Sequence, residues 1–361
     1  MTVTLRSYEP AELIPPGRTL AEWLEHAGMT QADFAKRSSL TAKHINQVVK
    51  GTVGISPEVA LAFEMVTSIP SRYWLQLDAN FQSAKQRLVE TADLADHVGV
   101  VDRFPYAELE RRGAVPAART KVDKLRELLR FFGVADVHAL GAVSMQPSLY
   151  RLSNAFEPSD AALASWLRLA EREAATIETA PFDLVACREV VGKMRHLSTL
   201  RGTQWLEPLR ELSASVGIAV VVVKELPKCR VNGATRWLSP DKAMIAMSFR
   251  YRRNDVFWFT FFHELGHVIR HSKKETFIDS GASSGIEKKL EREADAFASR
   301  TLIPPADAAR LPGLRTAEDV VAFAEEIGVA PGIVVGRMQH DNLIPQNRWT
   351  SMFDRYKFAD D

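Results

Sequence analysis

The sequence has few cysteines and no long apolar run. Only two cysteines, Cys187 and Cys229, occur in 361 residues, too few for a disulfide framework and in keeping with a reducing compartment. No run approaches the ~20 apolar residues of a membrane-spanning helix. The N-terminal stretch MTVTLRSYEPAELIPPGRTL contains no apolar segment of signal-peptide length. We therefore expect a cytoplasmic protein that does not enter a membrane.

The sequence also lacks an excess of either charge, with 46 lysines and arginines against 45 aspartates and glutamates. The resulting net charge of +1 excludes a global electrostatic attraction to nucleic acid or membranes, so any nucleic-acid surface must be local. Hydrophobic residues make up 46% and charged residues 25%, which is typical of a globular chain with room for two or three domains.

Hydrophobic periodicity predicts a mainly α chain with a small β-sheet, an α+β fold class. The first 91 residues read as a bundle of helices with short links, and residues 92–180 are largely helical. Further on, the β-branched run GIAVVVVKEL predicts a buried strand, followed by shorter strands in GATRWLS and KAMIAMSFR. We expect three parts, which are a bundle over 1–91, a helical connecting region over 92–180 and an α+β domain over 181–361.

The segment DVFWFTFFHELGHVI, inside a helix predicted over 255–272, carries two histidines in an apolar stretch. Residues four apart lie on one face of a helix, so His263 and His267 can direct their rings at one metal ion. Zinc lowers the pKa of a bound water to roughly 7, and Glu264 can accept the proton of that water as the catalytic base. The alternative is a pair of surface histidines. The apolar surroundings argue against it, because buried polar groups are costly without partners or a metal.

A catalytic zinc takes three protein ligands and keeps one position open, so a third ligand is required. The sequence EREADAFASRTLIPP supplies acidic candidates on a helix predicted over 287–302. We assign Glu291 as the third ligand, with Glu293 as the alternative. Asp295 is the expected hydrogen-bond partner of a histidine's far nitrogen, and Ala294 and Ala298 keep that helix face slim.

Other side chains near these motifs have weaker signals. Arg270 stands where a metzincin pattern requires glycine, so His271 is interpreted as a flanking residue. Cys229 could block a zinc ion as a thiolate, but a small half-buried side chain is the simpler interpretation. The sequence leaves the stabiliser of a tetrahedral oxyanion open among Arg236, Tyr251 and His340.

Residues 30–51, TQADFAKRSSLTAKHINQVVKG, predict two short helices joined by a tight turn. In the second helix Ile45, Val48 and Val49 share an inward face, and the opposite face carries the amides and lysines suited to the major groove. The candidate DNA contacts are Gln31, Thr41, Lys43, Asn46, Gln47 and Lys50. A solvated amphipathic helix that binds no nucleic acid is the alternative. The turn spacing and the flanking glycine stops favour DNA binding.

Both halves of the chain resemble known families. Residues 15–81, with PPG, MTQADFA, INQVVKG and YWLQLDANF, resemble the Xre-type helix-turn-helix of HigA-family antitoxins. From about residue 181 the chain resembles the ImmA/IrrE metallopeptidases. The matching segments are GATRWLSPDKAMIAMSFR, FWFTFFHELGHVIRH, EREADAFASRTLIPP and GVAPGIVVGRMQHDNLIP. This second resemblance implies a gluzincin-like zinc site on His263, His267 and Glu291, with Glu264 as catalytic base.

The resemblance also implies regulation, since such peptidases cut transcriptional repressors after a stress signal. Here the DNA-binding and peptidase parts are fused in one chain, which leaves the substrate open. We expect a regulator that binds a double-stranded DNA operator as a homodimer and cleaves a repressor, a toxin–antitoxin partner or itself. One alternative is a non-enzymatic HigA-like antitoxin or repressor with a structural or sensory zinc. Another is a peptidase whose helix-turn-helix serves only dimerisation.

Overall fold

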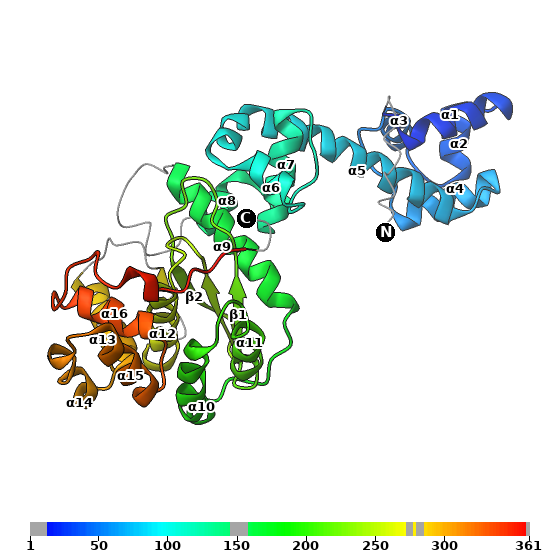
Figure 1. The fold of residues 1–361 in the computed structure, drawn as a ribbon. Helices are drawn as coiled ribbons and strands as arrows, with labels where there is room; N and C mark the ends of the chain where they lie inside the picture. Colours follow the sequence, from blue (N-terminus) through cyan, green and yellow to red (C-terminus); the bar gives the residue numbers. More distant parts are fainter. Residues whose placement is uncertain (1–12, 145–157, 272–276, 279–284, 359–361) are drawn as a thin grey trace. The chain divides into compact units, whose positions relative to one another are not determined.

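The computed structural model describes residues 13–144, 158–271, 277–278 and 285–358. The chain separates into two compact units, Met1–Val98 and Gly99–Asp361. Helices dominate the described parts of both units, and a small sheet lies in the second (Figure 1). The expected fold class is therefore confirmed, whereas the three-part domain division stays a prediction.

The described part of the first unit is helical throughout. Hydroxyl groups of Thr30, Thr41 and Ser56 accept backbone N–H groups at the starts of three of its helices, which satisfies donors that have no partner inside the helix. The helices are α1 (Pro16–His26), α2 (Gln31–Arg37), α3 (Ala42–Val49), α4 (Pro57–Thr67) and α5 (Ser71–Asp96).

The predicted helix pair within 30–51 is confirmed as α2 and α3. Ile45 and Val48 of α3 are fully buried in a core that includes Phe34 of α2 and Phe63 of α4. A close backbone contact fixes α1 against α3, because a Cβ atom at Gly17 would lie 2.1 Å from the Val48 carbonyl oxygen. The fold thus presents α3 with its apolar face inward.

Helix α5 is longer than the sequence predicted. The predicted bundle ends at residue 91, whereas α5 continues to Asp96 and has 26 residues. Only Trp74, in the core of the first unit, and Leu94, near the end of the helix, are buried. Solvated polar residues that favour helix account for the extension, since the apolar periodicity used for the prediction fades before the helix ends.

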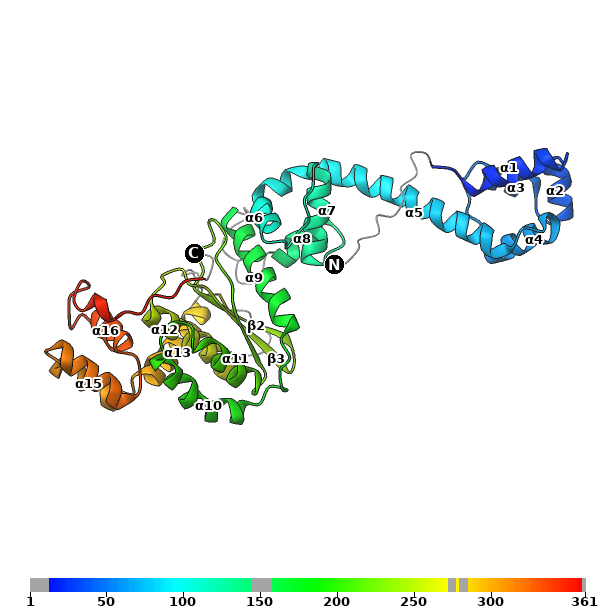
Figure 2. The same cartoon turned by 45° about the vertical axis from the view of Figure 1, so that its right-hand side comes forward.

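In its described residues the second unit contains helices on both sides of the sheet (Figures 1 and 2). Its α-helices are α6 (Tyr106–Arg111), α7 (Lys121–Phe132), α8 (Val137–Ser144), α9 (Pro158–Thr176), α10 (Leu184–His196), α11 (Leu206–Ala214), α12 (Asn254–Arg270), α13 (Gly285–Leu302), α14 (Pro305–Ala308), α15 (Ala317–Ile327) and α16 (Pro331–His340). The short 3-10 helices are η1 (Val98–Arg103), which crosses the boundary between the units, η2 (Leu197–Thr199), η3 (Leu311–Gly313) and η4 (Thr350–Met352).

The sheet has the strand order β1-β3-β2-β4. Strand β3 pairs in parallel with β1 and antiparallel with β2, and β4 adds a short antiparallel edge to β2. The three predicted strands are confirmed, and β4, which was not predicted, is the addition. The strands are β1 (Ile218–Val222), β2 (Gly233–Ser239), β3 (Lys242–Met247) and β4 (Phe277–Ile278).

Alternation along β2 separates the two faces of the sheet. Thr235 lies opposite Ile245 of β3, whose side chain belongs to the core that includes α12. Arg236 is the next residue and so points to the other face, where α9 packs (Figure 2). The two faces therefore present different side chains to different helices, and Thr235 shares its face with α12.

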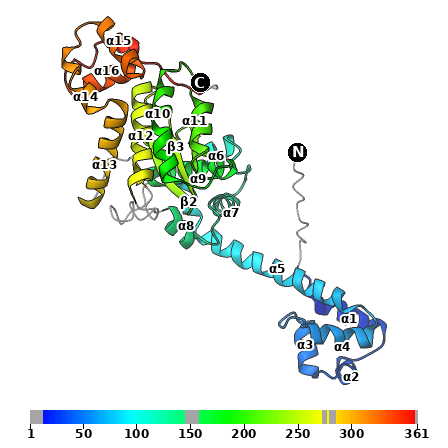
Figure 3. The ribbon, with the colours of Figure 1, turned by 90° about the horizontal axis from the view of Figure 1, so that it is seen from below.

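Helices α12 and α13 lie side by side (Figure 3). The bulky side chains of Trp258, Phe261 and Phe262 fill the core around α12, as the apolar sequence predicted. The helix ends at Arg270, slightly earlier than expected, because His271 adopts an extended backbone conformation. Helix α13 begins at Gly285, slightly before the helix predicted over 287–302.

Candidate metal centre and nucleic-acid interface

Three side chains from α12 and α13 converge on one point. His263 Nε2 and His267 Nε2 are 3.0 Å apart, and the Glu291 carboxylate lies 3.1 Å from the first and 3.5 Å from the second. One potential ligand atom from each residue falls within 4.8 Å of the others. The helical repeat places both histidines on one side of α12, and α13 brings the carboxylate to them.

A small contact surface makes this approach possible. A Cβ atom at Gly266 would lie 3.2 Å from the Cα of Ala294, so the backbones of α12 and α13 come close at this point. Glu291 lies one turn before Ala294 and therefore reaches the histidines. The sequence indicated Ala294 but not Gly266. The glycine inside the HELGH motif, which has no side chain, could have indicated this close contact.

The donor set fits zinc. Two imidazole nitrogens and one carboxylate oxygen form the ligand set of a three-ligand zinc site that keeps a fourth position open. His263 and His267 are almost fully buried, while the Glu291 side chain is 29% exposed, which leaves the cluster open on the α13 side. Among the acidic, histidine and cysteine side chains of the described residues, His263, His267 and Glu291 lie close enough together to share a metal ion.

Asp295 contacts the far nitrogen of a histidine. Its Oδ1 lies 2.9 Å from His263 Nδ1, which suits an imidazole that donates from Nδ1 and turns Nε2 toward the cluster. Glu293, the alternative third ligand, lies elsewhere, with its carboxylate 3.5 Å from His271 Nε2. The geometry thus groups Glu291, rather than Glu293, with the two histidines.

The two clustered histidines differ in charge when no metal is bound. Burial by itself would lower the pKa of His263, but hydrogen bonds to Asp295 and Glu291 outweigh it and raise the pKa to about 10. For His267, burial and the nearby His263 and His271 lower the pKa to about 2. A metal ion binding here must therefore displace a proton from His263, since only a neutral imidazole nitrogen is a ligand.

Glu264 is fully buried beside the cluster and is held by the sheet. The Thr235 hydroxyl lies 2.7 Å from Glu264 Oε2 and donates to it. Gly233 leaves space for the same side chain, because a Cβ atom there would lie 2.9 Å from Glu264 Cγ and 2.7 Å from Thr260 Cγ2. Neither Gly233 nor Thr235 was identified from the sequence, since no local pattern links β2 to α12. Thr235 and Glu264 are 29 positions apart.

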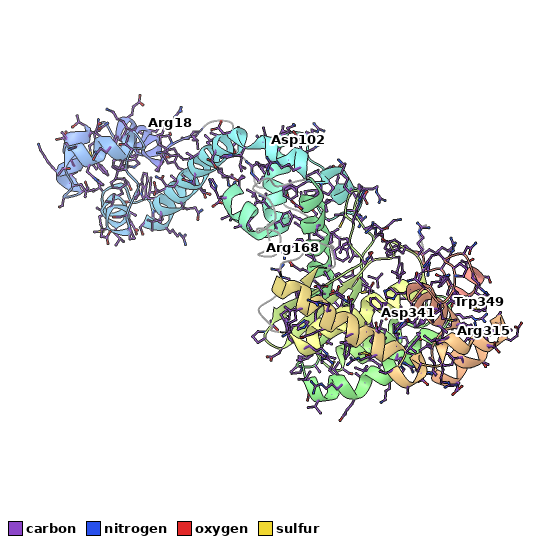
Figure 4. The ribbon with its side chains drawn as sticks, turned by 90° about the vertical axis from the view of Figure 1, so that its left-hand side faces the viewer. Arg18, Asp102, Arg168, Arg315, Asp341 and Trp349 are labelled. Carbon is purple, nitrogen blue, oxygen red and sulfur yellow. The ribbon has the colours of Figure 1, made fainter. Side chains whose placement is uncertain are left out.

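The three oxyanion candidates occupy different surroundings. Arg236 forms an ion pair with Glu171 of α9, a carboxylate that also pairs with Arg168 at 3.1 Å. Arg168 is labelled in Figure 4. Arg236 therefore points away from the face that carries Glu264. The Tyr251 side chain is about half exposed, and His340 is 85% exposed beside Asp341.

Cys229 is buried, and it does not have the properties of an activated thiolate. Burial raises its pKa to about 12, and burial likewise raises the pKa of Cys187 to about 11. A reactive or metal-binding cysteine needs the opposite shift. The simpler interpretation of Cys229 as a small packing side chain fits this environment better than a zinc-blocking thiolate.

The candidate DNA-contacting residues lie around the start of α2 and the outer face of α3. Lys43, Asn46 and Lys50 are exposed, and Gln47 is partly exposed. Asn46 Nδ2 donates to Gln31 Oε1 at 3.4 Å, which links the start of α2 to the middle of α3. Thr41 is exposed and caps α3 by accepting the His44 N–H at 3.1 Å. The structure thus joins Gln31 of α2 to Asn46 of α3 and leaves Thr41, Lys43 and Lys50 exposed.

Comparisons with known proteins agree with both halves of the chain. Residues 20–74 match the helix-turn-helix family, and residues 250–339 match a peptidase family described as the IrrE N-terminal-like domain. The second match includes the HELGH motif and Glu291. No curated protein matches the chain. Among the described helices, none has the length and apolar character needed to cross a membrane.

From the two family matches, the chain carries a helix-turn-helix domain together with an IrrE N-terminal-like, metallopeptidase-like domain.

Proposed function

We propose that this chain is a DNA-bound transcriptional regulator whose C-terminal domain is a zinc-dependent endopeptidase. The observation that carries the proposal is the convergence of His263, His267 and Glu291 beside the buried carboxylate of Glu264. A purely structural zinc site gives no reason for a buried glutamate held next to it by a threonine.

In this proposal His263, His267 and Glu291 hold the zinc ion. When bound there, zinc supplies Lewis acidity, which promotes ionisation of water and polarises a carbonyl group. Asp295 keeps His263 in the tautomer whose Nε2 faces the cluster. Glu293 is not a ligand in this arrangement.

Glu264 acts as the proton carrier of peptide hydrolysis. Water attacks the peptide carbonyl carbon, the Glu264 carboxylate accepts a proton from that water, and the C–N bond breaks as the proton passes to the leaving amine. Thr235 donates to Glu264 Oε2 at 2.7 Å and so orients the carboxylate of the base. Burial excludes competing bulk water from this exchange.

The helix-turn-helix supplies the DNA target. Gln47 and Asn46 present amides that can pair with adenine in the major groove, and Lys43 and Lys50 can meet guanine or phosphate. Gln31 and Thr41, at the starts of α2 and α3, lie where helix N-termini meet the DNA backbone. We propose a cytoplasmic homodimer on a two-fold operator, with a repressor, a toxin–antitoxin partner or the chain itself as substrate.

The test is the zinc content of the full chain, measured by mass spectrometry after zinc loading and dialysis. We expect about one zinc per chain in the wild type and in Glu293→Ala, and none in Glu291→Ala. Glu293→Ala tests the alternative ligand on the same helix, and Glu318→Ala, at an exposed carboxylate on α15, is the control. A wild-type chain without zinc would refute the peptidase proposal, and loss of zinc in Glu293→Ala alone would refute the ligand assignment.

A further inference from the structure

The two clustered histidines differ in how their outer nitrogens are held. A metal-binding histidine donates its second N–H to an acceptor, which fixes the ring and its tautomer. For His263 the acceptor is Asp295. For His267 the neighbouring group is a third histidine, because His267 Nδ1 lies 2.9 Å from His271 Nδ1.

The position of His271 at the end of α12 makes this contact possible. Its backbone N–H donates to the His267 carbonyl at 3.1 Å, which keeps it one turn beyond His267. Its side chain is 2% exposed. The extended backbone at His271 ends the helix, so this residue closes the histidine row of the buried face.

The outer nitrogen of His271 faces a carboxylate. His271 Nε2 is 3.5 Å from Glu293 Oε2, and the other oxygen of Glu293 lies 3.9 Å from Lys289 Nζ. Only one assignment of protons suits a metal at His267 Nε2. His267 then donates from Nδ1, His271 accepts at Nδ1, and His271 carries its own proton on Nε2, toward Glu293.

We propose that His271 is the positioning residue for His267 and that Glu293 sets the tautomer of His271. The inference rests on the proposed metal site and adds a second support to it. Asp295 holds His263 directly, whereas Glu293 holds His267 through the His271 ring. Glu293, which the sequence offered as a ligand, lies beside the His271 ring, 3.5 Å from its Nε2, and not in the metal cluster.

The experiment compares His271→Asn with His271→Leu in the full chain. Asparagine keeps an acceptor oxygen near the position of Nδ1, while leucine has similar bulk and no acceptor. The zinc dissociation constant is measured by competition with a chelating dye, and the thermal midpoint of the metal-free protein reports on folding. Glu293→Gln is the milder variant, and Glu318→Gln, an exposed carboxylate on α15, is its control.

We expect His271→Leu to weaken zinc binding about 10- to 100-fold and His271→Asn to stay within about threefold of the wild type. Glu293→Gln should weaken it by less than about tenfold, with Glu318→Gln unchanged. Equal affinity in wild type and His271→Leu would overturn the inference while leaving the metal site intact. Equal loss in both His271 variants would also overturn it, since packing alone would then explain the effect. A wild-type chain that binds no zinc would overturn the proposed function as well.

Discussion

Helices α12 and α3 both carry the side chains on which function is proposed, and burial separates them. On α12, His263, Glu264 and His267 are at most 5% exposed, so each must find a partner or raise the free energy of the fold. On α3, Lys43, Asn46 and Lys50 are exposed, and water can satisfy them. Burial therefore restricts the side chains of the proposed metal site more strongly than those of the proposed DNA-contacting surface.

The largest effect should come from Glu264→Gln. We expect cleavage of a proteome-derived peptide library, read by mass spectrometry, to fall about a hundred- to ten-thousandfold, because the amide cannot carry the proton. Zinc content should stay at the wild-type level, since Glu264 is not among the clustered ligands. Glu318→Gln is the control. A zinc-loaded wild type that cuts no more than Glu264→Gln would favour the non-enzymatic repressor with a structural zinc.

The next effect concerns the backbone that holds α3 in place. Gly17→Ala should destabilise the first unit by about 3 kcal/mol, because the new Cβ would overlap backbone atoms of Val48 and Val49, which cannot rotate away. Amide hydrogen exchange of α1 and α3 in the full chain would show this as faster exchange. Gly28→Ala has no atom within 4 Å of its Cβ but a φ of +61°, so it should cost only about 1 kcal/mol. Equal exchange in the two variants would contradict the close contact.

Strong periodicity made much of the fold predictable. The apolar residues around HELGH predicted α12, and the alanines after Glu291 predicted α13. Both helices bury one face, so their apolar residues recur with the helical period. The cluster of His263, His267 and Glu291 followed from helical spacing together with one packed neighbour. At the DNA surface, alternation between buried Ile45 and Val48 and exposed Lys43 gave the outward face of α3.

The parts that sequence reasoning missed depend on tertiary register. Thr235 meets Glu264 only because β2 lies beside α12 with that residue facing it. Arg236 was an oxyanion candidate by residue type, but its place one position later on β2 turns it toward Glu171. His271 and Glu293 were assigned separately, and the packing of α12 on α13 brings them together. No spacing within one helix contains that information.

The proposed DNA-contacting surface can be tested by comparing a residue expected to contact a base with one expected to contact a phosphate. On a duplex selected from a random library, Gln47→Ala should lose about 1–3 kcal/mol of binding free energy and relax the preference at one base pair. Lys50→Ala should weaken all sequences similarly and reduce the slope of log K against log salt by about 1. Lys85→Ala, on the exposed middle of α5, is the control. Binding unchanged in both α3 variants would favour a helix-turn-helix that serves only dimerisation.

The smallest effect is expected at Cys229, a buried side chain outside the proposed metal site. Cys229 is as buried as the metal centre, yet burial raises its pKa to about 12, so only about one thiol in ten thousand is ionised at pH 8. Cys229→Ala should therefore leave zinc affinity within about twofold of the wild type. Cys187 and Cys229 should react with a thiol reagent only after unfolding.

The pH dependence follows from the direction of these shifts. A thiol whose folded pKa is raised stabilises the fold below its unfolded pKa, and this contribution is lost as pH rises from about 9 toward the folded value. Measured unfolding free energies should therefore fall less steeply above pH 9 in Cys229→Ala than in the wild type. Rapid labelling of folded Cys229, or a changed zinc affinity in Cys229→Ala, would show that a buried thiol with a raised pKa can still be activated. The distinction between Cys229 and the buried polar residues of α12 would then be wrong, because it depends on hydrogen-bonding partners as well as on burial.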